Sequence, residues 1–194
     1  MRVMILEKNS GFMMGKYVSF FVLSFLFLTS GKAVDHKKNE SAVYVKYANE
    51  IINSFVREMK EEFNLHCSGS GGGMPYDVEE ISVGLVSYKK ASIEDARELE
   101  VMATERLLKL INEHEKIRPF LREYPFKANR AKVAIYFSPI KNAKLEEDVV
   151  ARVTQIKNKI YYLTEEKVTK QYISLAEELY EEALKIVQKK AVKL

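Results

Sequence analysis

Two segments of the chain carry residue types that can do chemistry, and the first surrounds its single cysteine. Cys67 follows His66 and precedes a run of glycine and serine. A cysteine thiolate beside a histidine base is a nucleophile, as in thiol-dependent hydrolases and transferases. Successive glycine amides can also cradle an anion. Cys67 is therefore a catalytic candidate, and the ligand-binding candidates beside it are Ser68, Gly69, Ser70, Gly71, Gly72 and Gly73.

The base for Cys67 is the weak point of this hypothesis. In an extended segment neighbouring side chains point to opposite sides, so His66 is a poor partner. His114, at the end of an expected helix, is the other candidate, and the fold would have to bring it to Cys67. The alternatives are a core-edge position for His114 and a buried, inert Cys67 beside a flexible loop. We favour these alternatives, because the glycine patterns of phosphate-binding and dinucleotide-binding loops are absent from the sequence.

The second segment is the irregular connection at residues 117–130, which contains two prolines. Arginines and aromatic residues are interleaved there, a combination that suits recognition of an anionic or planar group. Alternatively, the aromatic residues pin a long loop to the core while the arginines stay in water. The ligand-binding candidates in this connection are Arg118, Arg122, Tyr124 and Arg130.

The sequence does not indicate a metal site or a nucleic-acid-binding surface. The three histidines and one cysteine have no zinc-ligand spacing, and the acidic runs lack the calcium-loop pattern. Outside residues 1–33 the chain has 27 basic and 26 acidic residues, a net charge of +1. Nucleic-acid binders usually carry a clustered basic surface. We expect no metal, no cofactor and no nucleic-acid partner.

The N-terminal segment predicts export. Lys16 precedes an uncharged apolar run at residues 17–28, and small residues typical of a cleavage site follow. The 15 uncharged residues between Lys16 and Lys32 would span about 22 Å as a helix, less than the roughly 30 Å of a bilayer core. We expect a signal peptide within residues 1–33 and a periplasmic or secreted protein. The alternative is an uncleaved segment that anchors the protein in the membrane.

Hydrophobic periodicity indicates the elements that must position these candidates. A polar lead-in is expected at residues 34–41, and a glycine-rich loop at residues 68–75. Steps of three and four between apolar residues predict helices at 42–63, from Ser92 to about His114, and from a capping box of Ser174 and Glu177 onward. Alternation predicts strands at 80–88, 131–137, 149–156 and 159–164, with a polar loop at 141–148.

This order, α-β-α-β-β-β-α, predicts an α+β two-layer sandwich. About three helices cover one face of a four-stranded mixed or mostly antiparallel sheet, and the other face stays open. Residues 42–194 are expected to form this single domain. A composition of 47% hydrophobic and 30% charged residues is ordinary for such a domain, and one cysteine excludes an intrachain disulfide.

Three functional hypotheses follow. The first is an exported, non-enzymatic protein that binds another protein or an envelope component through the open sheet face or the arginine-rich connection. The second is a thiol-dependent hydrolase or transferase that uses Cys67. The third is a module tethered to the membrane by its uncleaved N-terminal segment.

Overall fold

The structure is a computed structural model that describes residues 32–138, 149–166 and 168–192. The predicted signal peptide, apart from its last residues, and the predicted loop at 141–148 lie outside the described residues. No helix in the part of the chain that the structure describes is both long enough and apolar enough to cross a membrane.

The described chain forms three α-helices, a short 3-10 helix and six strands. The helices are α1 (Lys32–Phe63), α2 (Ile93–Glu113), η1 (Arg118–Phe120) and α3 (Tyr180–Ala191). The strands are β1 (His66–Gly73), β2 (Glu80–Ser87), β3 (Ala131–Phe137), β4 (Arg152–Ile156), β5 (Lys159–Glu165) and β6 (Tyr172–Leu179). The protein is therefore of the α+β class.

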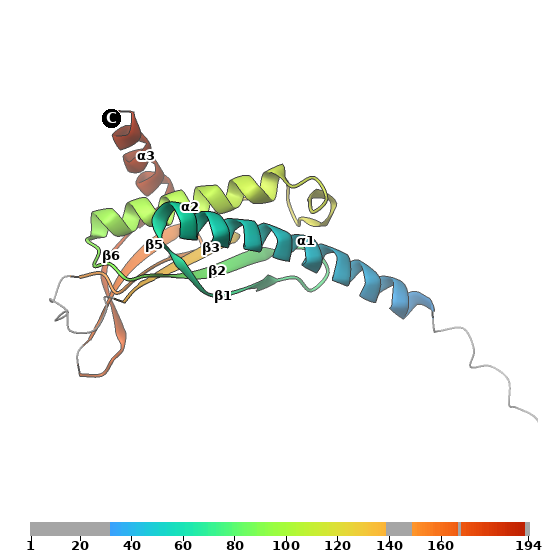
Figure 1. Ribbon diagram of the computed structural model, residues 1–194, viewed down its shortest axis with the longest axis horizontal. Coiled ribbons are helices and arrows are strands. Elements are labelled where there is room, and N and C mark those ends of the chain that lie inside the picture. Colours follow the sequence, from blue (N-terminus) through green and yellow to red (C-terminus); the bar gives the residue numbers. More distant parts are fainter. Residues whose placement is uncertain (1–31, 139–148, 167, 193–194) are drawn as a thin grey trace, which may run out of the picture.

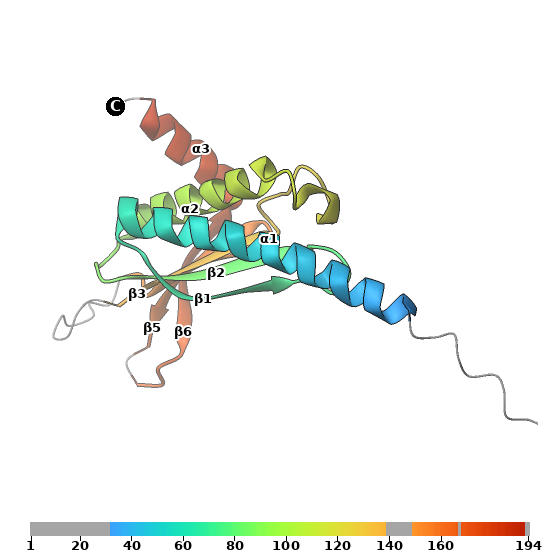
Figure 2. The same cartoon turned by 45° about the vertical axis from the view of Figure 1, so that its right-hand side comes forward.

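The strands form one mixed sheet in chain order, β1-β2-β3-β4-β5-β6. Only β2 and β3 are parallel, and α2 makes the crossover between them, as the sequence predicts. The other neighbours are antiparallel. All three helices lie on the same side of the sheet, which leaves its second face without a helix (Figures 1 and 2).

The core lies between α1, α2 and the sheet. Helical spacing places one apolar stripe of each helix toward the strands, and alternation places every second strand residue toward the helices. The fully buried side chains of this interface include Phe55, Met59, Leu107, Ile111, Ile81, Leu85, Ile135, Ile160 and Tyr162. Ser92 caps α2 through a reciprocal hydrogen-bond pair with Asp95, the capping arrangement that its position predicts.

The sheet has six strands where the sequence predicts four, and the first additional strand is the glycine-rich segment. The expectation of a loop there is wrong, because residues 66–73 pair antiparallel with β2. Glycine has no side chain, so the alternation that reveals a strand is absent from this segment. Gly72 also fits a close approach: a Cβ there would lie 2.2 Å from the backbone oxygen of Glu80.

The second additional strand is β6, which replaces the predicted first turn of the last helix. Ser174 and Glu177 form no capping box; they lie in a strand paired with β5, and α3 begins only at Tyr180. Pairing with β5 satisfies the backbone groups of residues 172–179, which outweighs the local helix signal. At the other end of the domain, residues 34–41, the expected polar lead-in, lie within α1 (Lys32–Phe63).

Candidate binding face of the sheet

Cys67 lies on the edge strand β1, and its thiol is exposed. The thiol donates a 3.6 Å hydrogen bond to the carbonyl oxygen of Gly69. The adjacent His66 ring lies against Lys60, whose Nζ is 2.8 Å from Nε2, and against the Tyr88 ring. The expected burial of Cys67 is wrong, because an edge strand of glycine and serine has no bulky side chains to cover the sulfur.

His114 caps the C-terminal end of α2 and lies in a different part of the helical layer. Its Nδ1 accepts a 3.2 Å hydrogen bond from the backbone N–H of Ile117, and its Nε2 is 3.6 Å from a Glu50 carboxylate oxygen. Along α1, Glu50 is about 15 Å from Lys60, the residue beside the Cys67 segment. The structure therefore does not bring Cys67 and His114 together.

The glycine-rich candidates, Ser68 to Gly73, are spread along β1 instead of converging on one point. Their strand pairs with β2 along most of its length, with a bulge between Cys67 and Gly69. A Cβ on Gly69 or Gly71 would meet no atom within 4 Å. A cradle needs successive amides directed at one ligand, whereas β1 presents an extended, smooth edge.

The arginines of the connection after α2 are occupied by partners within the protein. Arg122 Nε donates a 3.1 Å hydrogen bond to Asp77, and this bond raises the pKa of the guanidinium. Arg130 bonds Glu123 at 2.5 Å and thereby lowers the pKa of that carboxyl. Arg122 thus ties the connection to the segment before β2, and Arg130 also donates to the backbone oxygen of Glu79. The arginines therefore do not stay free in water, whereas the aromatic Phe126 of the same connection is buried.

Arg118 and Tyr124 form a contact of their own at the surface. The Arg118 guanidinium carbon lies 4.7 Å from the centre of the Tyr124 ring, and the same group is 3.4 Å from the carbonyl oxygen of Asn112. Both side chains are exposed. This pair is separate from the Arg122 and Arg130 ion pairs, so the four candidates do not form one site.

The uncovered side of the sheet, which we call the open face, gathers a different set of residues. Alternation places there the strand residues that are not directed at the helices. Register aligns them in rows across β2 to β5. The described open face includes Glu80, Ser82, Gly84, Val86, Lys132, Ala134, Tyr136, Arg152, Thr154, Ile156, Lys159, Tyr161, Leu163 and Glu165, with Tyr172 and Ser174 on β6.

Near one end of the open face Arg152, the first residue of β4, lies close to two tyrosine rings. Its guanidinium carbon is 5.0 Å from the centre of the Tyr136 ring and 5.9 Å from that of Tyr172. Tyr136 in turn reaches toward Gly84, where a Cβ would lie 3.8 Å from the ring. We call Tyr136, Arg152 and Tyr172 the tyrosine–arginine row. Cation–π contacts of this kind orient a guanidinium and leave its edge available for hydrogen bonds.

The charges around the row are paired with one another, and Arg152 is the exception. On and beside the open face, Lys132 pairs with Glu80, Lys159 with Glu177, and Lys170 with Glu165. Among residues 32–138, 149–166 and 168–192, no carboxylate forms an ion pair with Arg152, and its buried Nε has no hydrogen-bond partner. Within the part of the chain that the structure describes, the row thus carries one positive charge that no ion pair compensates.

A buried acid lies on the opposite side of β4. Glu100 on α2 is fully buried, and burial raises its pKa to about 8 against the opposing effects of the Gln155 backbone amide and of Arg152. At neutral pH the Glu100 carboxyl is therefore mostly protonated. It does not neutralise Arg152 through the sheet.

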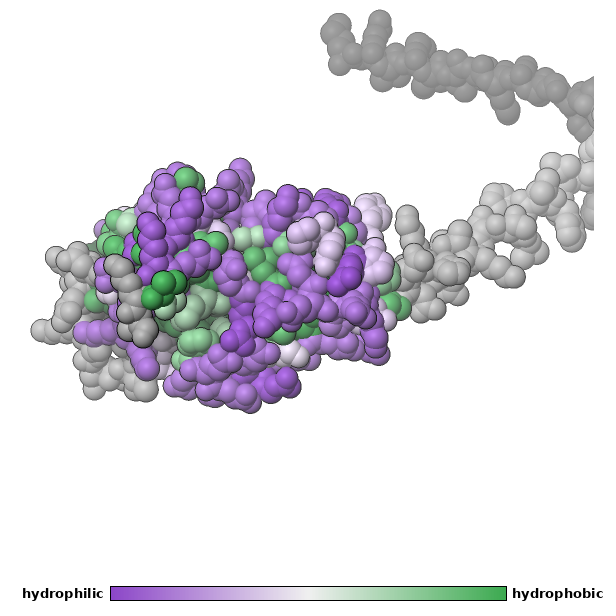
Figure 3. All heavy atoms as spheres, turned by 90° about the horizontal axis from the view of Figure 1, so that it is seen from above, coloured by the Kyte–Doolittle hydropathy of each residue, from purple (hydrophilic) through white to green (hydrophobic). Residues whose placement is uncertain are grey.

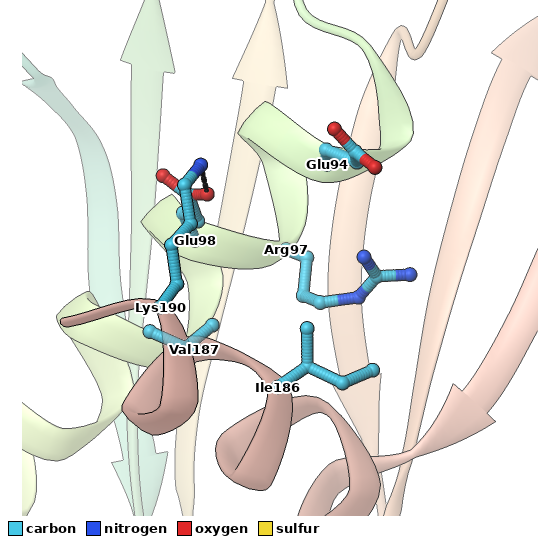
Figure 4. A pocket seen from close by; sticks show the side chains of 6 residues that line it. All are labelled: Glu94, Arg97, Glu98, Ile186, Val187 and Lys190. Atoms are coloured by element: carbon cyan, nitrogen blue, oxygen red, sulfur yellow. Dashed lines mark hydrogen bonds and ion pairs between the residues drawn. The ribbon is translucent and has the colours of Figure 1, made fainter. Parts of the chain in front are cut away.

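The helical layer offers no comparable surface. Figure 3 shows that layer from above, with mostly hydrophilic side chains and smaller apolar areas among them. One furrow, of about 250 Å³, lies between α2 and α3. Figure 4 shows Lys190 paired with Glu98 at its rim, and Arg97 is held by Glu178 at 2.7 Å. The basic groups of this furrow thus already have acidic partners.

A wider trough of about 520 Å³ lies where the C-terminal end of α1 meets α2. Phe63, Leu99, Met102 and Phe137 contribute apolar surface, and charged side chains such as Lys89 and Glu62 surround them. The trough is open and its charges are of both signs. It does not single out a ligand.

Metal ligation and similarity to known proteins add no further site. Within the described stretches of the chain, no group of three or more His, Cys, Asp and Glu side chains is placed to hold a metal ion. Comparison of the chain with models of protein families, with curated proteins and with solved structures found no match. The functional argument therefore depends on the geometry of the open face.

Sequence reasoning missed all three members of the tyrosine–arginine row. Tyr136 and Arg152 lie within predicted strands, and alternation with Ile135 and Val153 was the signal that directs them to the opposite face. Tyr172 precedes the segment that was interpreted as the start of a helix, so its strand position was not visible in the sequence.

Proposed function

We propose that this chain is an exported, non-enzymatic binding protein that docks a protein or envelope component on the open face of its sheet. The observation that carries the proposal is the tyrosine–arginine row, in which a cation that has no carboxylate partner among the described residues lies close to two aromatic rings. Aromatic and arginine side chains are the types most enriched at the centres of protein interfaces.

The composition of the face supports docking of an extended partner. Gly84 and Ala134 keep its middle low, while Val86 and Leu163 add half-buried apolar surface beside Tyr136 and Arg152. An open, twisted sheet face with aromatic anchors favours a broad contact over a small enclosed ligand.

The thiol-dependent alternative has less support. Cys67 is exposed, but a thiolate enzyme needs a base within reach. Among the described residues His66 is engaged with Lys60, and His114 lies beside Glu50. Exposure of the Cys67 sulfur is not by itself an argument for a catalytic thiol.

Export is part of the proposal and has its own test. The protein is recovered outside the cytoplasm and its N-terminus is sequenced. We expect the mature chain to begin just after Ala33. A protein that is found in a membrane fraction and retains the apolar run at residues 17–28 would support the anchored alternative in place of the released protein.

Docking is tested by site-specific photocrosslinking in the cells that produce the protein. A benzophenone amino acid replaces Ser174, an exposed open-face residue, or in a matched control Glu182, an exposed residue of α3. We expect one discrete adduct from position 174, identified by mass spectrometry, that is lost with the additional substitution Arg152→Gln. Equal labelling from both positions, or none from position 174, contradicts the proposal.

A further inference from the structure

We propose that Arg152 binds a peptide carboxylate, with the backbone of that peptide lying across the open face. This inference rests on the proposed docking function and specifies the chemistry of the partner. It follows from four features of the row: its geometry, its unsatisfied donor, its net charge and its apolar neighbours.

The geometry favours a planar oxyanion. The rings of Tyr136 and Tyr172, at 5.0 and 5.9 Å from the guanidinium carbon, restrict the Arg152 side chain to few orientations. An arginine held in this way presents two parallel N–H groups, which match the two oxygens of a carboxylate. The side chain is then already ordered in the free protein, so ligand binding costs little additional side-chain entropy.

The donor inventory shows that an acceptor is missing from the described protein. Nε of Arg152 is buried without a hydrogen-bond partner, although buried polar atoms are normally satisfied. Other arginines of comparable exposure have acceptors, as Arg97 has Glu178 and Arg130 has Glu123. Nε itself is covered, so an incoming carboxylate would bind the terminal N–H groups of the same guanidinium, whose charge has no other acceptor among the described carboxylates.

The net charge selects a monoanion. The lysines nearest in the sheet register, Lys132 and Lys159, are each paired with a glutamate. Arg152 is therefore one positive charge with no second free cation beside it in the described face. A phosphate dianion is usually held by more than one positive group or by helix N-terminal amides, whereas a carboxylate needs one.

The neighbours of the row favour an apolar residue next to the carboxylate. In the sheet register Val86 is opposite Tyr136, and Leu163 is opposite Arg152. Both side chains are half-buried, and Leu163 is on the strand next to Arg152. A C-terminal residue with an aliphatic side chain satisfies the charge and the apolar surface together. An acidic side chain within a peptide satisfies mainly the charge.

The test is an NMR titration of the full chain that observes the Arg152 Nε–H signal, assigned by its loss in Arg152→Lys. The probes are N-acetylleucine, its uncharged amide, N-acetylglutamate α-amide and inorganic phosphate. We expect a saturable shift with N-acetylleucine and none with its amide. Binding by the variants, which lack this signal or alter it, is followed through the backbone amide signals of Tyr136 and Leu163, the register partners of Arg152. Arg152→Lys should weaken binding about tenfold through loss of one charge-assisted hydrogen bond. The matched control Arg57→Lys, an exposed arginine of α1, should leave binding unchanged.

The other probes define the outcomes that overturn or narrow the proposal. A response to N-acetylglutamate α-amide as strong as that to N-acetylleucine assigns the carboxylate to an acidic side chain. A response to phosphate alone overturns it in favour of a phosphorylated partner, and no response to any probe overturns it outright. Tyr172→Ser, which removes an exposed ring outside the core, should weaken binding and covers the case in which Arg152 variants fail to fold.

The two experiments separate this inference from the docking function. A crosslink from position 174 without a carboxylate response leaves the docking function standing and removes Arg152 as a carboxylate receptor. A carboxylate response without any crosslink contradicts the docking function.

Discussion

Glu100 on α2 lies against the backbone amide of Gln155 on β4, inside the core. Neither Glu100 carboxyl oxygen completes a hydrogen bond within the described residues, and Gln155 Oε1 also lacks a partner. Burial raises the pKa of Glu100 from 4.5 to about 8. A carboxyl group in such surroundings stays protonated near neutral pH. The charged form loses more hydration free energy on burial than it gains from the nearby amide.

The first prediction concerns the pH dependence of stability. The unfolded chain releases the Glu100 proton near pH 4.5, and the folded chain releases it near pH 8. Above the lower pH the unfolded state binds fewer protons, so the free energy of unfolding falls as pH rises from about 4.5 to 8 and then levels off. Glu100→Gln removes this contribution. The variant should gain stability over the parent as pH rises, measured by urea unfolding at pH 5, 7 and 9.

The matched control for this prediction is Glu113→Gln on the same helix, where the side chain is 65% exposed. Its difference from the parent should be nearly constant with pH. A Glu100→Gln variant whose difference from the parent is also constant would show that Glu100 ionises normally in the folded protein.

The second prediction concerns the attachment of α2 to β6. Arg97 Nε is 2.7 Å from Glu178, the two side chains are 17% and 15% exposed, and Tyr162 donates a hydrogen bond to the same carboxylate. Arg97→Met leaves Glu178 without its cation and should lower the free energy of unfolding by about 3 kcal/mol, measured by denaturant unfolding.

Two controls accompany the Arg97 variant. Lys109→Ala breaks a pair whose side chains are 64% and 65% exposed, and it should cost no more than about 0.5 kcal/mol. The double variant Arg97→Met with Glu178→Met should recover part of the loss, because no unpaired charge remains buried. A single variant as mild as Lys109→Ala would show that this ion pair does not hold the two elements together.

The third prediction tests whether the glycine-rich segment is a strand. Gly72→Ala places a methyl group where it meets the Glu80 backbone oxygen, and should destabilise the protein by about 1 to 3 kcal/mol. Gly71→Ala enters open space and should be neutral or slightly stabilising, since alanine restricts the unfolded chain. Thermal or urea unfolding of the two variants measures this difference. Equal effects at both positions would contradict the pairing of β1 with β2.

The fourth prediction concerns the exposed thiol. Cys67 should react with a thiol reagent in native buffer, at a rate within about tenfold of that in urea, because no side chain covers its sulfur. The variant Cys67→Ser, which has no thiol, gives the background signal of the reagent. Labelling that appears only after unfolding would place the sulfur in the interior.

The sequence predicted those elements whose buried side chains repeat with a clear period. Helices α1 and α2 carry apolar stripes, and β2 and β3 alternate strictly between buried and half-buried residues. It could not predict β1, since its glycines and serines carry no pattern. Residues 172–179 contain a plausible helix cap but are held as β6 by the backbone of β5.

By itself, the sequence determined the α+β class, the parallel crossover through α2, the open sheet face and the lack of a second cysteine, because local periodicity and composition encode these features. Only the tertiary structure decided that Tyr136, Arg152 and Tyr172 meet. They come from three strands separated by turns and connections, and register brings their side chains onto one face. The register depends on the packing of the whole core, which no local stretch of sequence specifies.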